Sequence, residues 1–219
     1  PDSTLVNLEK VSDSLGGKGV LWELFSFNPA TLRLYVEVCA TSPYLSGILI
    51  ANPGMIDGLL DSLMLDRLPS RKMLRDTLAE LCRAAEDIDP ILHSFKNAFQ
   101  LRVGVRDILG KEDIQATTEA LTDIAEACLE QITSREVPKL TKRRGRPTRS
   151  EGPRAGEPCE LVIVAMGKFG GRELNYHSDL DLVLLYEGDG QTVPESRVAQ
   201  PTSNQHFFGE LGQRIIKSA

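Results

Sequence analysis

Two aspartates, Asp179 and Asp181, stand two residues apart beside an apolar run and are the side chains best placed to do chemistry. Alternate residues of an extended strand point to one face, so this spacing predicts that the two carboxylates lie together. Neighbouring carboxylates repel each other unless a cation sits between them, and hard divalent ions such as Mg²⁺ take oxygen ligands. The pair alone also fits a solvated turn, because Ser178 followed by Asp179 suits a turn.

Three glycines, Gly167, Gly170 and Gly171, precede the aspartates and follow a short apolar run. A loop without Cβ atoms allows backbone N–H groups to approach phosphate oxygens closely. The spacing matches neither the Walker A pattern nor GxGxxG, and glycine clusters alone often only turn the chain. The combination of strand, glycine loop and Asp-x-Asp is more specific, and it resembles the active site of the polymerase-β-like nucleotidyltransferases.

The residues that must position this loop show strand and helix patterns in turn. Two runs rich in leucine and β-branched residues, at 160–165 and 180–186, predict strands of a buried sheet on either side of the loop. From about residue 202, apolar residues recur at helical spacing: Phe207, Phe208, Leu211 and Ile215. This part of the chain therefore indicates the beginning of an α/β or α+β domain.

Residues 1 to about 135 carry repeated helix signals and no alternating strand pattern. A capping side chain followed by proline marks three helix starts, at Asn28, Asn52 and Asp89. Apolar residues at helical spacing form the predicted core stripes: Leu32, Tyr35, Val36, Cys39, Ile56, Leu59, Leu60, Leu63, Leu74, Leu78, Leu81, Ala85, Leu92, Phe95, Phe99, Ile114, Leu121, Ile124, Cys128 and Ile132. The first part of the chain is predicted to be all-helical.

The sequence predicts an α+β protein with three parts. An all-helical domain spans residues 1–137, a basic flexible linker spans 138–158, and the N-terminal part of a nucleotidyltransferase domain with a mixed sheet spans 159–219. Residues 144–147 (RGRP) match the core of the AT-hook, a peptide that lies in the DNA minor groove. We favour a solvated linker over DNA binding, because one four-residue match in a basic linker has little specificity.

Composition excludes several classes of protein. The four cysteines show no CxxC or Cys/His spacing, which predicts small buried hydrophobes in a reducing cytoplasm: Cys39, Cys82, Cys128 and Cys159. Three isolated histidines argue against a zinc site. No apolar run reaches the length of about eighteen residues that a membrane span needs. The chain starts with neither Met nor a leader pattern, so we expect no signal peptide and a piece of a longer polypeptide.

A closer resemblance covers most of the chain. Residues 167–182 (GKFGGRELNYHSDLDL) resemble the motif of the glutamine synthetase adenylyltransferase family, and 207–216 (FFGELGQRII) resemble the helix that follows it. Residues 21–25 (LWELF) and 46–60 resemble the helical region before a catalytic domain in that family. Members have two nucleotidyltransferase domains. One attaches AMP from ATP to a tyrosine hydroxyl of glutamine synthetase, the other removes it by phosphorolysis, and glutamine and a PII signalling protein set the balance.

The resemblance implies a role for each residue of the motif. Asp179 and Asp181 would be catalytic ligands of Mg²⁺ or Mn²⁺, with ATP as the substrate. Gly170, Gly171 and Ser178 would bind the nucleotide. In such sites the metal ions make the acceptor oxygen more nucleophilic and neutralise the leaving pyrophosphate.

Two features leave alternatives open. Lys168 and Arg172 are as consistent with surface bystanders as with phosphate contacts. The third carboxylate of such sites, which the family places in a later motif resembling Val-Asp-x-Arg-Leu-Arg-Pro, is absent from the sequence, so we expect the chain alone to be inactive or nearly so. The adenylylating half is our first interpretation. The AMP-removing half, another polymerase-β-like transferase and a non-catalytic interaction module are the alternatives.

Overall fold

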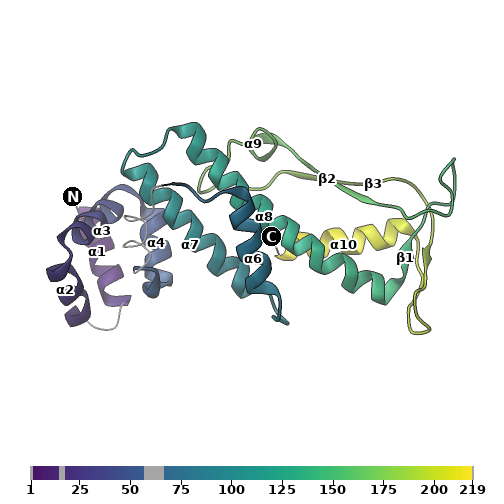
Figure 1. The fold of residues 1–219 in the computed structure, drawn as a ribbon, viewed down its shortest axis with the longest axis horizontal. Helices are drawn as coiled ribbons and strands as arrows, with labels where there is room; N and C mark the ends of the chain where they lie inside the picture. The colour runs from purple at the N-terminus through teal and green to yellow at the C-terminus, as the bar shows by residue number, and fades with distance from the viewer. Residues whose placement is uncertain (1, 15–17, 57–66, 219) are drawn as a thin grey trace. The chain divides into compact units, whose positions relative to one another are not determined.

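The computed structural model describes residues 2–14, 18–56 and 67–218, and the backbone contacts divide the chain into two compact units. The first unit comprises Pro1–Ile124 and Leu174–His177, and the second comprises Ala125–Glu173 and Ser178–Ala219. Most elements are helices, and the short strands come late in the chain (Figure 1). This composition of elements agrees with the predicted α+β class.

The first unit is built from helices, as predicted. They are α1 (Asp2–Ser14), α2 (Lys18–Phe27), α3 (Pro29–Thr41), α4 (Pro43–Ala51), the 3₁₀ helix η1 (Pro53–Met55), α6 (Arg71–Cys82), α7 (Asp89–Ile108) and the first part of α8 (Ile114–Arg144). Leu34, Val38, Leu49 and Leu101 belong to the buried apolar core of this unit. No single described helix is long and apolar enough to cross a membrane; α3 and α4 taken together meet the length and composition, with a bend of 117° between them.

Two of the three predicted helix starts are confirmed at the predicted residue. Asn28 and Asn52 are the N-cap residues of α3 and η1, although neither side chain makes a capping hydrogen bond. The third start differs, because Asp89 is already the first residue of α7. The Oδ1 atom of Asp87 accepts a hydrogen bond from the Asp89 N–H group at 3.0 Å. The side chain of Asp87, two residues earlier, therefore accepts from a free backbone N–H group at the N-terminus of α7.

Several predicted stripe residues do not belong to the core. The buried face of α6 follows a strict four-residue spacing, Leu74, Leu78 and Cys82, so Leu81 is turned outward and is 52% exposed. Ala85 lies beyond the end of α6. The side chains of Val36 and Ile114 are also exposed. Leu59, Leu60 and Leu63 lie outside the described residues.

Helix α8 corrects the prediction of a flexible linker over residues 138–158. The helix passes Pro138 and continues to Arg144. Strand β1 (Arg146–Pro147) follows at once and pairs antiparallel with β4 (Thr192–Val193). This segment therefore contains regular structure, and the division between the two units falls inside α8, between Ile124 and Ala125, instead of after residue 137.

The second unit contains the two predicted strands as an antiparallel hairpin of β2 (Leu161–Ala165) and β3 (Leu182–Tyr186). The single-turn helix α9 (Gly167–Gly170) follows β2, and α10 (Asn204–Ser218) comes after β4. Helices α8 and α10 lie along one side of the hairpin (Figure 1). On that side the ring of Tyr186 stacks on Phe208, with centroids 4.8 Å apart, and Leu184 contacts α10 at Gly212.

The opposite face of the hairpin is exposed, which corrects the expectation of a buried sheet. Val162 is 50% exposed, Val183 is 41% exposed and Leu185 is 51% exposed. The helices cover one face only, so the continuous apolar run of β3 is half solvated. Both two-stranded sheets of the described residues are antiparallel, so the predicted mixed sheet is not present in that part of the chain.

Candidate active site

The glycine loop and the two aspartates lie at the same end of the β2–β3 hairpin. Antiparallel pairing places Ala165, the last residue of β2, opposite Leu182, the first residue of β3. One further hydrogen bond joins the Met166 N–H group to the Asp181 carbonyl oxygen at 2.8 Å. The pairing of the strands therefore brings the two motifs of the sequence together.

Asp179 and Asp181 lie on the exposed face of this hairpin. Both residues are exposed while Leu180 between them is half-buried, and the same alternation continues through Val183 and Leu185. Because side chains in extended backbone alternate with a period of two, the two carboxylates share the face that is turned away from α8 and α10. Both side chains are exposed and therefore accessible to a ligand, and their joint action on a metal ion stays a prediction.

Gly167 makes room for the carboxylate of Asp181. The φ angle of Gly167 is +52°, and a Cβ atom at this position would lie 2.6 Å from the Oδ2 atom of Asp181. Any other residue would therefore introduce both backbone strain and a steric clash. From spacing alone, Gly167 is one of three glycines in the loop, and its contact with Asp181 could not be predicted. The sequence signal for such a role is its position, two residues after the end of β2, the strand that ends beside the aspartates.

Gly170 and Gly171 close the single turn of α9. The Gly170 N–H group donates to the Met166 carbonyl at 2.9 Å, and the Gly171 N–H group donates to the Gly167 carbonyl at 3.0 Å. A Cβ atom at Gly170 would lie 2.5 Å from the carbonyl oxygen of Ala165, so glycine permits a close backbone approach here. The two N–H groups are engaged within the loop, and contact of Gly170 and Gly171 with a nucleotide stays a prediction.

Arg172 holds the end of the loop against α8. Its φ angle is +59°, which is uncommon for a residue other than glycine. Its Nη1 atom donates to Oε1 of Glu126 at 2.9 Å. Lys168 is exposed, and its carbonyl oxygen accepts a hydrogen bond from the Glu173 N–H group at 2.7 Å. Lys168 and Arg172 are the two cations that the sequence offers for phosphate contact. The structure pairs Arg172 with the Glu126 carboxylate.

The middle of the motif, Leu174–His177, belongs to the first unit. The Tyr176 hydroxyl donates to Oδ2 of Asp107 at 3.2 Å, and its ring packs on Tyr44 with centroids 5.9 Å apart. Burial, together with the Asp107 carboxylate, raises the pKa of Tyr176 above its ordinary value. Ser178, the next residue, belongs to the second unit and is half-buried. Its contact with a nucleotide stays a prediction.

The two carboxylates supply the oxygen ligands that Mg²⁺ prefers. Within residues 2–14, 18–56 and 67–218, no group of three or more His, Cys, Asp or Glu side chains gathers into a potential metal site. Asp179 and Asp181 would therefore provide part of a coordination shell, which water and substrate phosphates commonly complete. The donor set fits a divalent ion.

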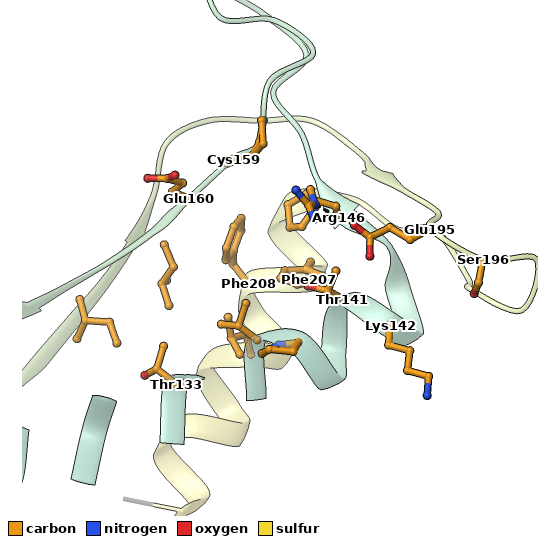
Figure 2. Close-up of a pocket in the computed structure, with 17 residues that line it drawn as sticks. Thr133, Thr141, Lys142, Arg146, Cys159, Glu160, Glu195, Ser196, Phe207 and Phe208 are labelled. Carbon is orange, nitrogen blue, oxygen red and sulfur yellow. Dashed lines mark hydrogen bonds and ion pairs between the residues drawn. The ribbon is translucent and has the colours of Figure 1, made fainter. Parts of the chain in front are cut away.

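A cavity of about 780 Å³ lies on the helix-facing side of the hairpin. Figure 2 shows Phe208 of α10 and Thr133 of α8 among the residues that line it, and Ile163 of β2 lines it as well. Ile163 pairs with Leu184, whose side chain faces α10, whereas the aspartates lie on the other face. This cavity is therefore not part of the site that Asp179 and Asp181 form.

The basic segment is held by ion pairs within the second unit. Arg144 contacts Glu210 at 3.1 Å, and Arg146 contacts Glu195 at 2.9 Å. Gly145 between them has a φ angle of +90°, and a Cβ atom there would lie 2.5 Å from the carbonyl oxygen of Val193. An AT-hook needs an extended segment whose arginines can enter the minor groove. Here the two arginines are engaged, so the structure favours neither DNA binding nor the solvated linker that the sequence predicts.

A hairpin that carries a glycine loop at one end and two aspartates on its open face is typical of nucleotidyltransferases. The model of one protein family matches residues 32–218, and this family is described as glutamate-ammonia ligase adenylyltransferase. The chain belongs to this family. The resemblance drawn from residues 167–182 and from the helical half is thereby confirmed.

Similar proteins carry the name bifunctional glutamine synthetase adenylyltransferase/adenylyl-removing enzyme. The proteins of Pseudomonas putida and Thioalkalivibrio sulfidiphilus are each 34% identical to the chain over 99% of its length, and that of Pseudomonas aeruginosa is 33% identical over 99%. These alignments cover 22%, 23% and 22% of the three relatives in the order putida, sulfidiphilus, aeruginosa. The chain thus spans less than a quarter of the length of the curated relatives that it matches.

Proposed function

We propose that this chain forms part of a site that transfers AMP from Mg-ATP to a tyrosine hydroxyl of glutamine synthetase. The observation that carries the proposal is the approach of the Asp181 carboxylate to Gly167, at the hairpin end where Asp179 and the glycine loop also lie. Membership in the adenylyltransferase family supports the same reaction class. The names of the relatives supply the protein substrate, glutamine synthetase.

Each residue of the site has a distinct task in this proposal. Asp179 and Asp181 hold the divalent ion through their carboxylate oxygens. Gly167 lets the Asp181 carboxylate sit close to the loop, and the turn formed by Gly170 and Gly171 gives the loop its shape. A bound Mg²⁺ or Mn²⁺ would make the acceptor oxygen more nucleophilic and neutralise charge on the departing pyrophosphate.

The regulatory partners are part of the same proposal. Family resemblance implies that glutamine and a PII signalling protein control the direction of the reaction in a cytoplasmic enzyme. The wide separation of the four cysteines along the chain fits a reducing compartment, and all four are free thiols.

The AMP-removing reaction is the second candidate, because the relatives carry both activities in their name. Both reactions use the same metal-bound phosphate chemistry, and the pair Asp179 and Asp181 serves either. The two are separated by the direction of the chemistry: one consumes ATP and releases pyrophosphate, and the other consumes phosphate and releases AMP as ADP.

The nucleotide site is tested on the chain itself. Calorimetric titration with ATP is expected to give binding in Mg²⁺ or Mn²⁺ and a loss of at least tenfold in affinity in EDTA. Asp179→Asn and Asp181→Asn should each remove the metal-dependent part. Asp189→Asn removes an equal charge from the other end of the hairpin and should bind as the parent does. Metal-independent binding, or none, would favour a non-catalytic module.

The reaction is tested in a longer polypeptide that carries this sequence, incubated with labelled ATP, Mg²⁺, glutamine and glutamine synthetase. Label on a glutamine synthetase tyrosine, lost in Asp179→Asn and Asp181→Asn, supports adenylyl transfer. Phosphate-dependent release of AMP groups from modified glutamine synthetase, without transfer, supports the AMP-removing half. Neither activity would return the site to the wider class of polymerase-β-like transferases.

A further inference from the structure

A second polar pocket lies at the other end of the hairpin from the aspartates, beside the start of α10. It encloses about 670 Å³. The end of α8 contributes Arg143 and Arg144, and α10 with its preceding residue contributes the rest: Ser203, Gln205, His206, Gly209, Glu210 and Gln213. The Nδ2 atom of Asn204, the first residue of α10, donates to the carbonyl oxygen of Gly188, which follows β3. This contact anchors the pocket at the end of β3 that is remote from Asp181.

The pocket carries an excess of positive charge. Glu210 accepts hydrogen bonds from Arg143 and Arg144, each at 3.1 Å, and from Arg214 at 3.0 Å. Burial opposes ionisation of Glu210, but the hydrogen bonds from Arg214 and Arg144 leave its pKa below the ordinary value. Glu210 is therefore a carboxylate, and one negative charge faces three guanidinium groups.

Neighbouring groups do not cancel this excess. Arg214 also contacts Glu136 at 3.1 Å, and Glu136 is in turn paired with Lys139 at 2.6 Å. The connected network of the described residues therefore holds four cationic side chains and two carboxylates, an excess of two positive charges. Of these charged groups, Arg143, Arg144 and Glu210 line the pocket, which leaves an excess of one positive charge at its wall that an anion would balance.

The pocket also has unused hydrogen-bond donors. A guanidinium group carries five N–H donors, yet among the described residues the Arg144 side chain bonds only through Nε, and the Arg143 side chain only through Nη1. The Arg144 side chain is only 16% exposed and lines the pocket. A forked pair of such donors matches the oxygens of a phosphate group.

Gly209 provides an independent observation, because the lack of a side chain at this position leaves the pocket unfilled. It lies in the interior of α10, where glycine destabilises a helix by about 0.5–1 kcal/mol relative to alanine. Packing explains Gly212, because a Cβ atom there would lie 3.0 Å from Cδ1 of Leu184. Packing does not explain Gly209, because a Cβ atom there would have no neighbour within 4 Å. A side chain at 209 would instead project into the pocket that Gly209 lines.

We propose that this pocket binds the phosphate group of a small phosphorylated molecule, with Arg143 and Arg144 as the anion-binding residues. Its volume lies within the range of about 300–1,000 Å³ that small-molecule sites occupy. The polar side chains of Gln205 and Gln213 then provide contacts to the uncharged part of the ligand. The pocket is separate from the site of Asp179 and Asp181, so this inference does not rest on the proposed transfer reaction.

The test is an NMR titration of the chain with inorganic phosphate and with AMP in buffer that contains EDTA. We expect saturable shifts at Arg143, Arg144 and residues 203–213. Arg143→Gln should weaken binding about tenfold, which is the loss of one charge-assisted contact. Arg83→Gln, a surface arginine paired with Glu80, should leave the affinity unchanged. Tighter binding of AMP than of phosphate would show that the ligand is a phosphate ester.

A glycine variant separates binding from folding. Gly209→Leu should raise the melting temperature, because it places a good helix former in a helix interior, and should weaken phosphate binding by tenfold or more. Gly47→Leu makes the same change at another helical glycine with open space around it and should leave binding unchanged. Shifts confined to residues 167–171, affinity unaffected by Gly209→Leu, or binding of polyglutamate without binding of phosphate would each overturn the proposal.

Discussion

The Oδ2 atom of Asp181 lies so close to Gly167 that a Cβ atom on that glycine would be only 2.6 Å away. The two residues are far apart in the motif, and the antiparallel pairing of β2 with β3 brings them into contact. The glycine loop and Asp181 are therefore packed against each other, so a larger residue at 167 is expected to displace the Asp181 carboxylate.

Replacing Gly167 with alanine tests this relationship directly. Gly167→Ala should push the Asp181 carboxylate out of position and place a non-glycine residue at a φ of +52°. We expect metal-dependent ATP affinity to fall about tenfold and the free energy of unfolding to fall by about 1–2 kcal/mol. Gly188→Ala is the control, because a Cβ atom there meets nothing within 4 Å. Unchanged ATP affinity in Gly167→Ala would separate Asp181 from nucleotide binding.

The ion pair between Arg172 and Glu126 should stabilise the end of the loop only modestly. Both side chains are partly exposed, at 35% and 22%, so solvent screens their attraction. A double-mutant cycle with Arg172→Gln and Glu126→Gln, measured by urea unfolding, should give a coupling energy of about 0.2–1 kcal/mol. If Arg172 instead contacts phosphate, Arg172→Gln should weaken ATP binding more than Glu126→Gln does.

Cys39 should make the protein less stable at high pH. Burial raises the pKa of its thiol from the ordinary 9.0 to about 11, so the unfolded chain loses this proton first as the pH rises. Stability is fully present below pH 9 and declines between pH 9 and about 11, by about 2–3 kcal/mol. In Cys39→Ala that part of the decline should disappear, while the two curves run parallel between pH 7 and 8. Parallel curves at all pH values would refute the assigned cause.

Gly145 should be less tolerant of substitution than Gly152, although both have a positive φ angle. A Cβ atom at Gly145 would lie 2.5 Å from the Val193 carbonyl oxygen, whereas one at Gly152 would meet nothing within 4 Å. Gly152→Ala should therefore carry only the backbone penalty of about 1–2 kcal/mol. Gly145→Ala should exceed that penalty by about 1 kcal/mol or more, because it also disturbs the pairing of β1 with β4. Equal losses in thermal unfolding would mean that this contact relaxes freely.

Local patterns were sufficient to predict strands β2 and β3 and most helices, but not the two-residue strands β1 and β4. The β-branched run before Gly167 became β2, the leucine-rich run after Asp181 became β3, and the apolar spacing from Phe207 onward became α10. These patterns arise between residues close together in the sequence, because the backbone of a strand or a helix sets the spacing at which side chains return to the same face. For the same reason the spacing of Asp179 and Asp181 was enough to place both on one face.

The course of residues 138–158 was not predictable from such patterns. Of the basic residues that suggested a flexible linker, Arg143 and Arg144 lie in α8 and Arg146 lies in β1. Their partners are distant in sequence: Glu210 for Arg143 and Arg144, and Glu195 for Arg146. An ion pair between residues about fifty or more positions apart leaves no periodic trace in the sequence. In the sequence these arginines have no nearby acidic partner, so the segment was interpreted as a solvated linker, although it is folded.

Residue types and their spacing were enough to predict the candidate site of this protein and to indicate its family: two aspartates two residues apart, a glycine loop before them, and a motif whose family is confirmed. The tertiary structure alone decided which glycine meets which carboxylate, that Arg172 is joined to Glu126, and that Gly209 opens a basic pocket. The physical reason is the range of the interactions. Strand and helix periods arise between near neighbours, whereas close approaches and charge networks exist only after distant segments have packed together.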